Sequence, residues 1–188
     1  MRSASVHYKW IAFSTLVRKE VRRFLRIWIQ TLVPPVITIS LYFVIFGNLI
    51  GRRIGEMSGY AYMDFIVPGL VLMAVINNAY ANVVSSFFSQ KYQRSIEELL
   101  VSPVPNYVIL AGFVVGGAAR GIMIGVVASV VAMFFSGFHM HNIFITLTVL
   151  ILSSVVFALG GLINAIYANK FDDINVIPTF VLTPLIYL

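Results

Sequence analysis

Four polar residues stand in stretches of the sequence that are otherwise apolar. Asn77, Asn78 and Asn82 lie within a run without charges at residues 65–90, and Arg120 lies among glycines. Inside a membrane, such amides and guanidinium groups hydrogen bond to a neighbouring helix or contact a substrate. These four residues are therefore candidates for a substrate path or for polar helix packing.

The sequence favours one role for the asparagines and is compatible with two roles for Arg120. Asn78 and Asn82 share a helix face at i, i+4 spacing, which favours hydrogen bonds between helices over contact with a substrate. Arg120 either faces a polar cleft, where it meets an anionic group or a partner helix, or extends its side chain to the cytoplasmic interface. Both interpretations of Arg120 stay open.

The motifs that mark enzymes are not present in the sequence. It contains no G-x-x-x-x-G-K-[ST] loop for ATP phosphates. His139-x-His141 has no carboxylate nearby, which makes a metal site a poor interpretation. No Asp or Glu lies deep in an apolar run, which argues against a proton relay. We therefore expect a protein that is not an enzyme and that binds no cofactor or metal itself.

One short segment is both amphipathic and acidic. Residues 95–103 place apolar side chains at i, i+3 and i+4 beside two glutamates, and Pro103 stops the helix. Acidic residues disfavour the negative inner leaflet, whereas such a helix can seat its apolar edge in a groove of a soluble partner. The residues expected to make this contact are Ser95, Ile96, Glu97, Glu98, Leu99, Leu100 and Pro103.

The composition identifies the elements that carry these residues. The 188 residues are 60% hydrophobic and only 11% charged, which indicates a helical membrane protein rather than a water-soluble domain. We predict an all-α polytopic fold. Four complete transmembrane helices are expected, at residues 28–50, 62–88, 107–135 and 143–168.

The N-terminal residues 1–27 form a separate unit of the predicted fold. Residues 7–28 carry aromatic and aliphatic side chains on one helical stripe and cations on the opposite arc. This pattern favours an interfacial helix in the plane of the headgroups. A cytosolic helix packed on another domain is the alternative.

The distribution of charge predicts the orientation. Ten of the thirteen Lys and Arg residues lie in the N-terminal segment or in the loops that share its side, and two lie in the outer loops. The positive-inside rule then places the N-terminus, the loop at about 89–106 and the turn at 170–173 in the cytoplasm. Asp172 and Asp173 become a possible second cytoplasmic contact. The net charge of +6 thus encodes orientation rather than nucleic-acid binding.

The last apolar run, residues 176–188, is too short to cross a bilayer. At about 1.5 Å per residue it reaches roughly 20 Å, against a hydrocarbon core of about 30 Å. We therefore expect part of a fifth transmembrane helix and a chain that is truncated or a fragment of a longer permease.

These elements together resemble a known family. The basic amphipathic helix, FIVPGL, NNAYANV, IEELLVSPVP and FDD-x4-PTFVLTPL follow the order seen in the ABC transmembrane type-2 permeases. The resemblance implies a bacterial inner-membrane domain at residues 28–188, normally completed by a sixth span. It implies that two permease chains pair and that each engages a soluble ATP-binding subunit, which holds ATP and Mg. Residues 95–103 then correspond to the coupling helix, and residues 7–28 to the elbow helix.

The expected function is the membrane-spanning permease subunit of an ATP-driven exporter. An ATP-independent carrier or channel is the alternative, and a membrane-embedded enzyme or scaffold is a further rival. Transport without any ATPase, or product formation by the purified chain alone, would favour these rivals. The sequence does not select a substrate.

Overall fold

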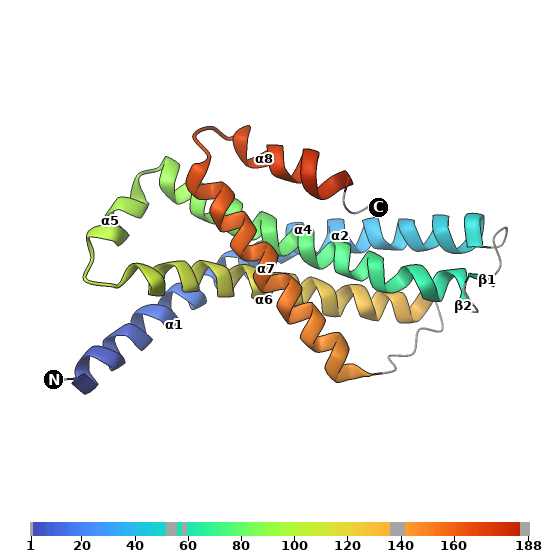
Figure 1. Ribbon diagram of the computed structural model, residues 1–188, viewed down its shortest axis with the longest axis horizontal. Coiled ribbons are helices and arrows are strands. Elements are labelled where there is room, and N and C mark those ends of the chain that lie inside the picture. The colour runs from blue at the N-terminus through green and yellow to red at the C-terminus, as the bar shows by residue number, and fades with distance from the viewer. Residues whose placement is uncertain (1, 52–55, 58–59, 136–141, 185–188) are drawn as a thin grey trace.

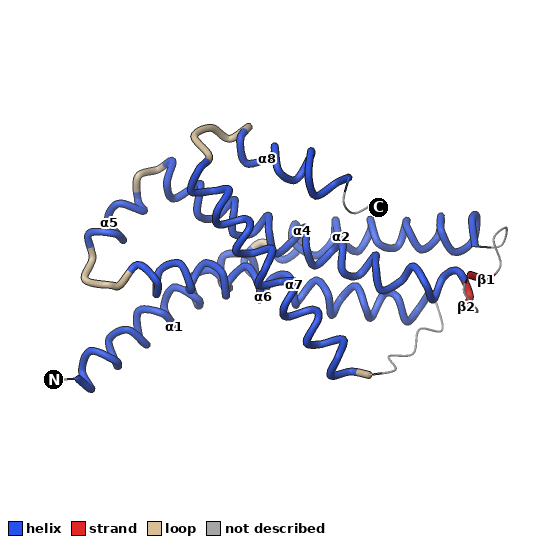
Figure 2. The backbone as a smooth tube through the Cα atoms, in the orientation of Figure 1, coloured by secondary structure: helices blue, strands red, loops and turns tan. Residues whose placement is uncertain are grey.

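The computed structural model describes residues 2–51, 56–57, 60–135 and 142–184. Helices dominate these residues, and one short strand pair accompanies them (Figure 2). In chain order the elements are α1 (Arg2–Arg26), α2 (Trp28–Phe43), the π-helix η1 (Val44–Gly51), β1 (Glu56–Met57), β2 (Tyr60–Ala61), α4 (Tyr62–Tyr92), α5 (Ser95–Val101), α6 (Asn106–Phe135), α7 (Ile143–Tyr167), α8 (Asp173–Ile177) and the π-helix η2 (Pro178–Leu182).

Four helices are long and apolar enough to cross a membrane: α2 with the start of η1, then α4, α6 and α7. They coincide with the four expected spans to within a few residues, because long apolar runs leave little choice of boundary. The predicted all-α polytopic fold is confirmed. Asp173–Leu182 forms a shorter apolar helix where part of a fifth span was expected.

Helices α2, α4 and α6 run roughly along the long axis of the molecule, and α1 and α7 run obliquely to it (Figure 1). The N-terminus, α5 and the turn before α8 lie at one end. The strands β1 and β2 lie at the other end, where Glu56 pairs with Ala61 and Met57 with Tyr60 in antiparallel register. The segments expected on the cytoplasmic side thus share one end of the bundle.

Helix α4 is the centre of the bundle and packs closely against α6 and α7. Glycines on α6 permit this approach: a Cβ at Gly121 would lie 2.8 Å from the Cβ of Ala79 and 3.0 Å from the Oγ of Ser154. On α7, a Cβ at Gly161 would lie 2.6 Å from the carbonyl oxygen of Tyr80. Glycines four residues apart, such as Gly117, Gly121 and Gly125 of α6, are typical of helices that pack this closely.

The buried apolar side chains form two clusters along the bundle. One contains Phe88, Ile96 and Phe113 near the end that carries α5. The other contains Phe43 and Ala128 toward the opposite end. Between them, α4 and α6 carry polar residues, described below, so a polar layer divides the apolar core.

The proline pair Pro34 and Pro35 lies inside a helix rather than at the start of one. Helix α2 begins at Trp28 and continues through both prolines. The break lies earlier, at Ile27, whose φ of −111° and ψ of 39° are not helical, and the backbone N–H of Thr31 donates to the Ile27 carbonyl oxygen at 3.0 Å. A helix tolerates proline within a membrane where neighbouring helices surround it.

Candidate functional site

The first part of the site is the contact between α1 and α6. Leu16, Glu20 and Phe24 recur every four residues on one face of α1 and are buried. Two glycines of α6 receive this face: a Cβ added at Gly112 would lie 2.8 Å from the Leu16 Cβ, and one at Gly116 would lie 2.5 Å from the Glu20 Cβ. The missing side chains therefore let α1 approach the backbone of α6.

The predicted interfacial stripe on α1 lies beside this buried face. Trp10 is 66% exposed, and the side chains of Phe13, Val17 and Val21 are partly exposed. Phe24, which belongs to the same stripe, is instead buried in the bundle. The helix thus has one face on α6, one apolar face free and one cationic face.

Glu20 and Arg23 form the charged centre of the contact. Their side chains make an ion pair of 3.3 Å, between Arg23 Nε and Glu20 Oε2. Arg23 Nη2 also donates to the side-chain oxygen of Asn82 at 2.9 Å and to its carbonyl oxygen at 3.0 Å. Arg23, counted in the sequence among the cations facing the headgroups, therefore turns inward and joins α1 to α4.

Arg120 of α6 reaches the same asparagine from the other side. Its Nη2 donates to Asn78 Oδ1 at 3.2 Å, and its Nη1 makes a longer bond of 3.5 Å to Asn82 Oδ1. Two guanidinium groups therefore share the Asn82 oxygen. Three buried polar atoms in this layer have no hydrogen-bond partner among the described residues: Glu20 Oε1, Asn82 Nδ2 and Arg120 Nε.

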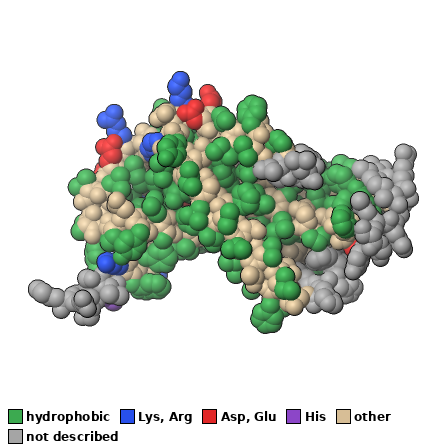
Figure 3. Space-filling model, in the orientation of Figure 1, with side chains coloured by type: hydrophobic (Ala, Val, Ile, Leu, Met, Phe, Trp, Pro, Cys, Tyr) green, Lys and Arg blue, Asp and Glu red, His purple; other side chains and the backbone are tan. Residues whose placement is uncertain are grey.

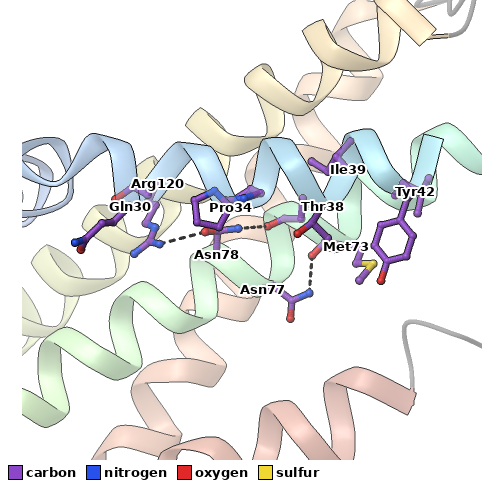
Figure 4. A pocket seen from close by; sticks show the side chains of 13 residues that line it. Gln30, Pro34, Thr38, Ile39, Tyr42, Met73, Asn77, Asn78 and Arg120 are labelled. Atoms are coloured by element: carbon purple, nitrogen blue, oxygen red, sulfur yellow. Dashed lines mark hydrogen bonds between the residues drawn. The ribbon is translucent and has the colours of Figure 1, made fainter. Parts of the chain in front are cut away.

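A cavity of about 290 Å³ opens beside Arg120. Helix α2 lines it with Gln30 through Tyr42, helix α4 with Leu70 through Asn78, and α6 with Arg120 alone (Figure 4). The guanidinium group points toward Asn78 in this view, while Pro34 and Thr38 of α2 lie alongside. Because prolines carry no N–H, the carbonyl oxygens of Gln30 and Thr31 lack their regular α-helical donors.

Only three of the four polar residues singled out in the sequence are joined by hydrogen bonds. Asn78 and Asn82 bind Arg120, whereas Asn77 uses its amide nitrogen on its own helix, donating to the Met73 carbonyl oxygen at 3.0 Å. Asn77 lines the cavity without contacting Arg120 through a hydrogen bond. Arg120 thus hydrogen bonds to the neighbouring helix α4 and borders the cavity, and its contact with an anionic group stays a prediction.

The acidic segment forms α5, a helix of seven residues at one end of the bundle. Ile96 is buried in the apolar cluster, and Leu99 packs against the same cluster. The two glutamates Glu97 and Glu98 are exposed. Leu100, predicted on the apolar face with Ile96, is 53% exposed, because a helix this short has only one turn against the bundle.

The connections around α5 fix its direction. Arg94 adopts a left-handed conformation with φ of 59°, the only positive φ at a non-glycine residue among those described. Ser95 Oγ donates to the Gln90 carbonyl oxygen at 3.3 Å and Ser102 Oγ to the Leu99 carbonyl oxygen at 2.5 Å. Pro103, included among the predicted contact residues, is exposed just after the helix. Helix α5 is thus held at both ends.

Charged side chains gather at this end of the molecule. On the face drawn in Figure 3, most Lys, Arg, Asp and Glu residues lie over α5 and the turn before α8, and much of the remaining described surface is hydrophobic. The exposed surface of α5 therefore combines two carboxylates with apolar side chains, of which Val101 is 87% exposed.

The two aspartates of the predicted second contact differ in their surroundings. Asp172 is exposed. Asp173 Oδ2 accepts the backbone N–H groups of Asn169 at 2.8 Å and Lys170 at 2.9 Å, and these bonds lower the pKa of Asp173 below its usual value. Asp173 therefore shapes the turn between α7 and α8.

Lys91 links the end of α7, just before this turn, to the last turn of α4. Its Nζ donates to the carbonyl oxygens of Ile166 at 2.6 Å and Ala168 at 2.7 Å. Phe171 lies with its ring centroid 4.9 Å from those of both Phe88 and Tyr92. The ends of α4 and α7 and the turn after α7 thus form one connected unit.

Sequence reasoning missed several of the residues that hold the site together. Glu20 lies among the cations of α1 in the sequence, and nothing in its sequence neighbourhood distinguishes this buried glutamate from an exposed one. Asn164, whose amide donates to Tyr80 Oη at 2.7 Å and to the Ile174 carbonyl oxygen at 3.1 Å, joins three helices. A polar residue in an apolar span was the available signal for Asn164. His139 and His141 lie outside the described residues.

Comparison with known proteins identifies relatives for nearly the whole chain. A family model described as "ABC-2 type transporter" matches residues 11–188. The "Inner membrane transport permease YadH" of Escherichia coli (strain K12) is 59% identical over 184 residues, which cover 97% of this chain and 72% of the relative. The protein of the same name from Shigella flexneri matches equally well.

A more distant relative is "Nodulation protein J" of Rhizobium leguminosarum bv. viciae. It is 23% identical over 149 residues, covering 79% of this chain and 58% of that protein. No solved structure matches.

Proposed function

Because the chain belongs to the ABC-2 type transporter family, we propose that it is the membrane-spanning permease subunit of an ATP-driven exporter. As a multi-pass inner-membrane transport protein it needs a source of energy, and its sequence has no loop for ATP phosphates. A separate ATP-binding subunit, which holds ATP and Mg, supplies this energy. The substrate then moves outward through a pair of permease chains.

The observation that carries the proposal is the surface of α5. This helix buries Ile96 in the bundle and directs Glu97 and Glu98 to the exterior at one end of the molecule. An exposed acidic rim around apolar side chains suits a groove of a soluble protein better than an anionic lipid surface. Helix α5 is accordingly the coupling helix, and its end of the bundle is cytoplasmic.

The contacts of α5 supply a route for motion into the bundle. Ile96 belongs to the same apolar cluster as Phe88 and Phe113, which lie on α4 and α6. Lys19 of α1 donates to the side chain of Gln90, one turn before α5, at 3.2 Å. Packed helices respond to such a push by moving as rigid elements. A displacement of α5 therefore reaches α4, α6 and α1 together.

The turn between α7 and α8 provides a second contact for the ATP-binding subunit. It lies at the same end as α5 and is bound to α4 through Lys91. Asp172 is the exposed carboxylate there, whereas Asp173 is engaged with the backbone. We assign the intermolecular role to Asp172 and an indirect, shaping role to Asp173.

Reversing the charge of α5 tests this function. The double variant Glu97→Lys and Glu98→Lys keeps Ile96 in the core, so the permease inserts and folds. Its affinity for the ATP-binding subunit should fall at least about tenfold, roughly 1.4 kcal/mol, because two complementary charges become repulsive. The measurement is binding of the ATP-binding subunit to permease in vesicles, together with the ATPase rate that the permease stimulates.

Asp64→Lys is the matched control, since Asp64 is an exposed carboxylate in the first turn of α4 at the other end of the bundle. This control should bind and stimulate as the unmodified protein does. Undiminished coupling in the α5 double variant would contradict the docking role of α5. Substrate transport in vesicles without any ATP-binding subunit would instead favour a carrier or channel.

A further inference from the structure

The polar layer of the bundle carries more positive than negative charge. Among its described residues, Arg23 and Arg120 contribute two guanidinium groups, and Glu20 contributes one carboxylate. Glu20 pairs with Arg23 at 3.3 Å. The hydrogen bonds described for Arg120 reach only neutral asparagine oxygens. One positive charge is therefore left without a countercharge inside an apolar bundle, which is unfavourable.

The cavity beside Arg120 offers room for the missing negative charge. No Asp or Glu lines it among the described residues. Arg120 lies at its wall, as does Asn78, whose amide nitrogen donates to the Ala74 carbonyl oxygen at 3.0 Å. A guanidinium group binds phosphate or carboxylate oxygens through parallel N–H groups. The chemistry of this wall thus selects an anion.

The rest of the cavity is suited to an apolar group. Ile39, Leu70 and Met73 line it away from the arginine, and Pro34 and Thr38 at its edge are exposed. At about 290 Å³ it is at the lower end of the usual size of ligand pockets. It therefore holds a headgroup with a few carbons, and a longer chain has to leave past the exposed edge of α2.

The depth of Arg120 in its helix favours an amphiphile over a free anion. Arg120 is fourteen residues after Asn106, the first residue of α6, which corresponds to about 21 Å along the helix. It lies one turn beyond Gly116, where α1 crosses α6. A headgroup and a free ion both lose their hydration at this depth, but an amphiphile also brings an alkyl tail, whose contact with the apolar wall of the cavity offsets part of that cost.

We propose that the cavity between α2, α4 and Arg120 binds the anionic headgroup of an amphiphile, phosphate or carboxylate, and that such amphiphiles are the substrate class of this permease. The proposal rests on the transport function proposed above, but binding itself needs no ATP-binding subunit.

The test measures binding of radiolabelled dodecyl phosphate to the purified protein in a neutral maltoside detergent. The neutral detergent is itself an amphiphile and is present in large excess over dodecyl phosphate. A site that does not select for charge is therefore filled by detergent and gives no signal. Arg120→Gln should weaken binding at least about tenfold, the effect of losing one charge-assisted hydrogen bond. Arg120→Lys should retain part of the affinity, because lysine keeps the charge and loses the planar fork.

Arg26→Gln is the matched control: it removes one exposed cation outside the cavity and should leave the affinity within about twofold. Equal binding by the Arg120→Gln variant and the unmodified protein overturns the proposal. Displacement of dodecyl phosphate by equimolar inorganic phosphate would assign the site to a free anion and overturn the amphiphile class.

A second variant covers the case in which Arg120→Gln fails to fold. Thr38→Trp adds a large side chain at the exposed edge of the cavity and keeps the polar layer intact. It should also lower affinity at least about tenfold, and unchanged binding refutes the site. The double variant at Glu97 and Glu98 should bind dodecyl phosphate normally. The double variant therefore tests only the docking of α5, through loss of coupling. Arg120→Gln and Thr38→Trp test only the cavity, through loss of dodecyl phosphate binding.

Discussion

Replacing Gly116 with alanine should detach α1 from α6. A Cβ at this position would lie 2.5 Å from the Cβ of Glu20 and 3.0 Å from its Cγ. Ordinary contact begins near 3.4 Å, so α1 has to retreat by about 0.9 Å (3.4 − 2.5). Because the obstructing Cβ is fixed to the backbone, rotation of the glutamate side chain does not relieve the overlap.

The retreat also lengthens the hydrogen bonds that join α1 to α4. Arg23 reaches the two oxygens of Asn82 at 2.9 and 3.0 Å, so a displacement of α1 away from α6 weakens both bonds. Overpacking of this kind costs about 1–3 kcal/mol, against a gain of at most ~1 kcal/mol in helix propensity. With a cost near the middle of that range, about 2 kcal/mol, and the full gain, the net loss is about 1 kcal/mol, or a factor of roughly 5 in the docking equilibrium of α1.

Two assays measure the effect. Thermal unfolding in neutral detergent reports the stability of the whole bundle. Thiol labelling of a Leu16→Cys variant reports docking directly, because the chain has no other cysteine and Leu16 is buried where α1 meets Gly112 of α6. Addition of Gly116→Ala should speed this labelling by the factor given above.

Gly160→Ala is the control, since no heavy atom lies within 4 Å of the Cβ it adds on α7. There the change should stabilise the helix by about 0.5–1 kcal/mol, because alanine loses less backbone entropy than glycine. The same substitution is thus expected to have opposite signs at two positions. Melting shifts of the same sign, or labelling of Leu16→Cys that Gly116→Ala leaves unchanged, would refute this account of the α1 contact.

Two further predictions concern the turn between α7 and α8. Lys91→Met removes the ammonium group that binds the last carbonyl oxygens of α7 and should destabilise this end by about 1–3 kcal/mol, whereas exposed Lys170→Met should have little effect in the same thermal melt. Asp173→Asn should speed hydrogen exchange at residues 169–170, and Asp172→Asn should not. Because the folded pKa of Asp173 is lowered, its contribution is complete above the ordinary carboxyl pKa of about 3.9 and is lost only as the pH falls through the lower folded value. Loss of protection already near the ordinary pKa would contradict the two backbone hydrogen bonds.

The sequence was sufficient for the elements whose signal is local. The spans follow from long apolar runs, and α5 follows from the acidic amphipathic segment that ends before Pro103. The four-residue spacing of glycines on α6 is typical of close helix packing, but it does not indicate which helix packs there. At Gly116 the partner is α1, for which the sequence favoured a position in the plane of the headgroups.

The contacts that make the site depend on residues far apart in the chain. Arg23 and Asn82 are separated by 59 positions, and Arg120 and Asn78 by 42. On α1 the aromatic stripe is the strongest local pattern, yet burial is decided by which face fits the glycines of α6. Glu20 lies on that face, and neither its charge nor its neighbours in the sequence indicate this.

The polar layer also restricts how α1 can travel along the bundle. When one helix slides along another through a purely apolar interface, each apolar contact that is lost is replaced by a similar one. Such an interface alone therefore permits gradual sliding. Arg23 finds its acceptors on Asn82 in one register only, and a shift by one turn leaves Glu20 and two guanidinium groups unmatched in a nonpolar medium. We therefore expect α1 to move between discrete registers on the bundle rather than to slide continuously.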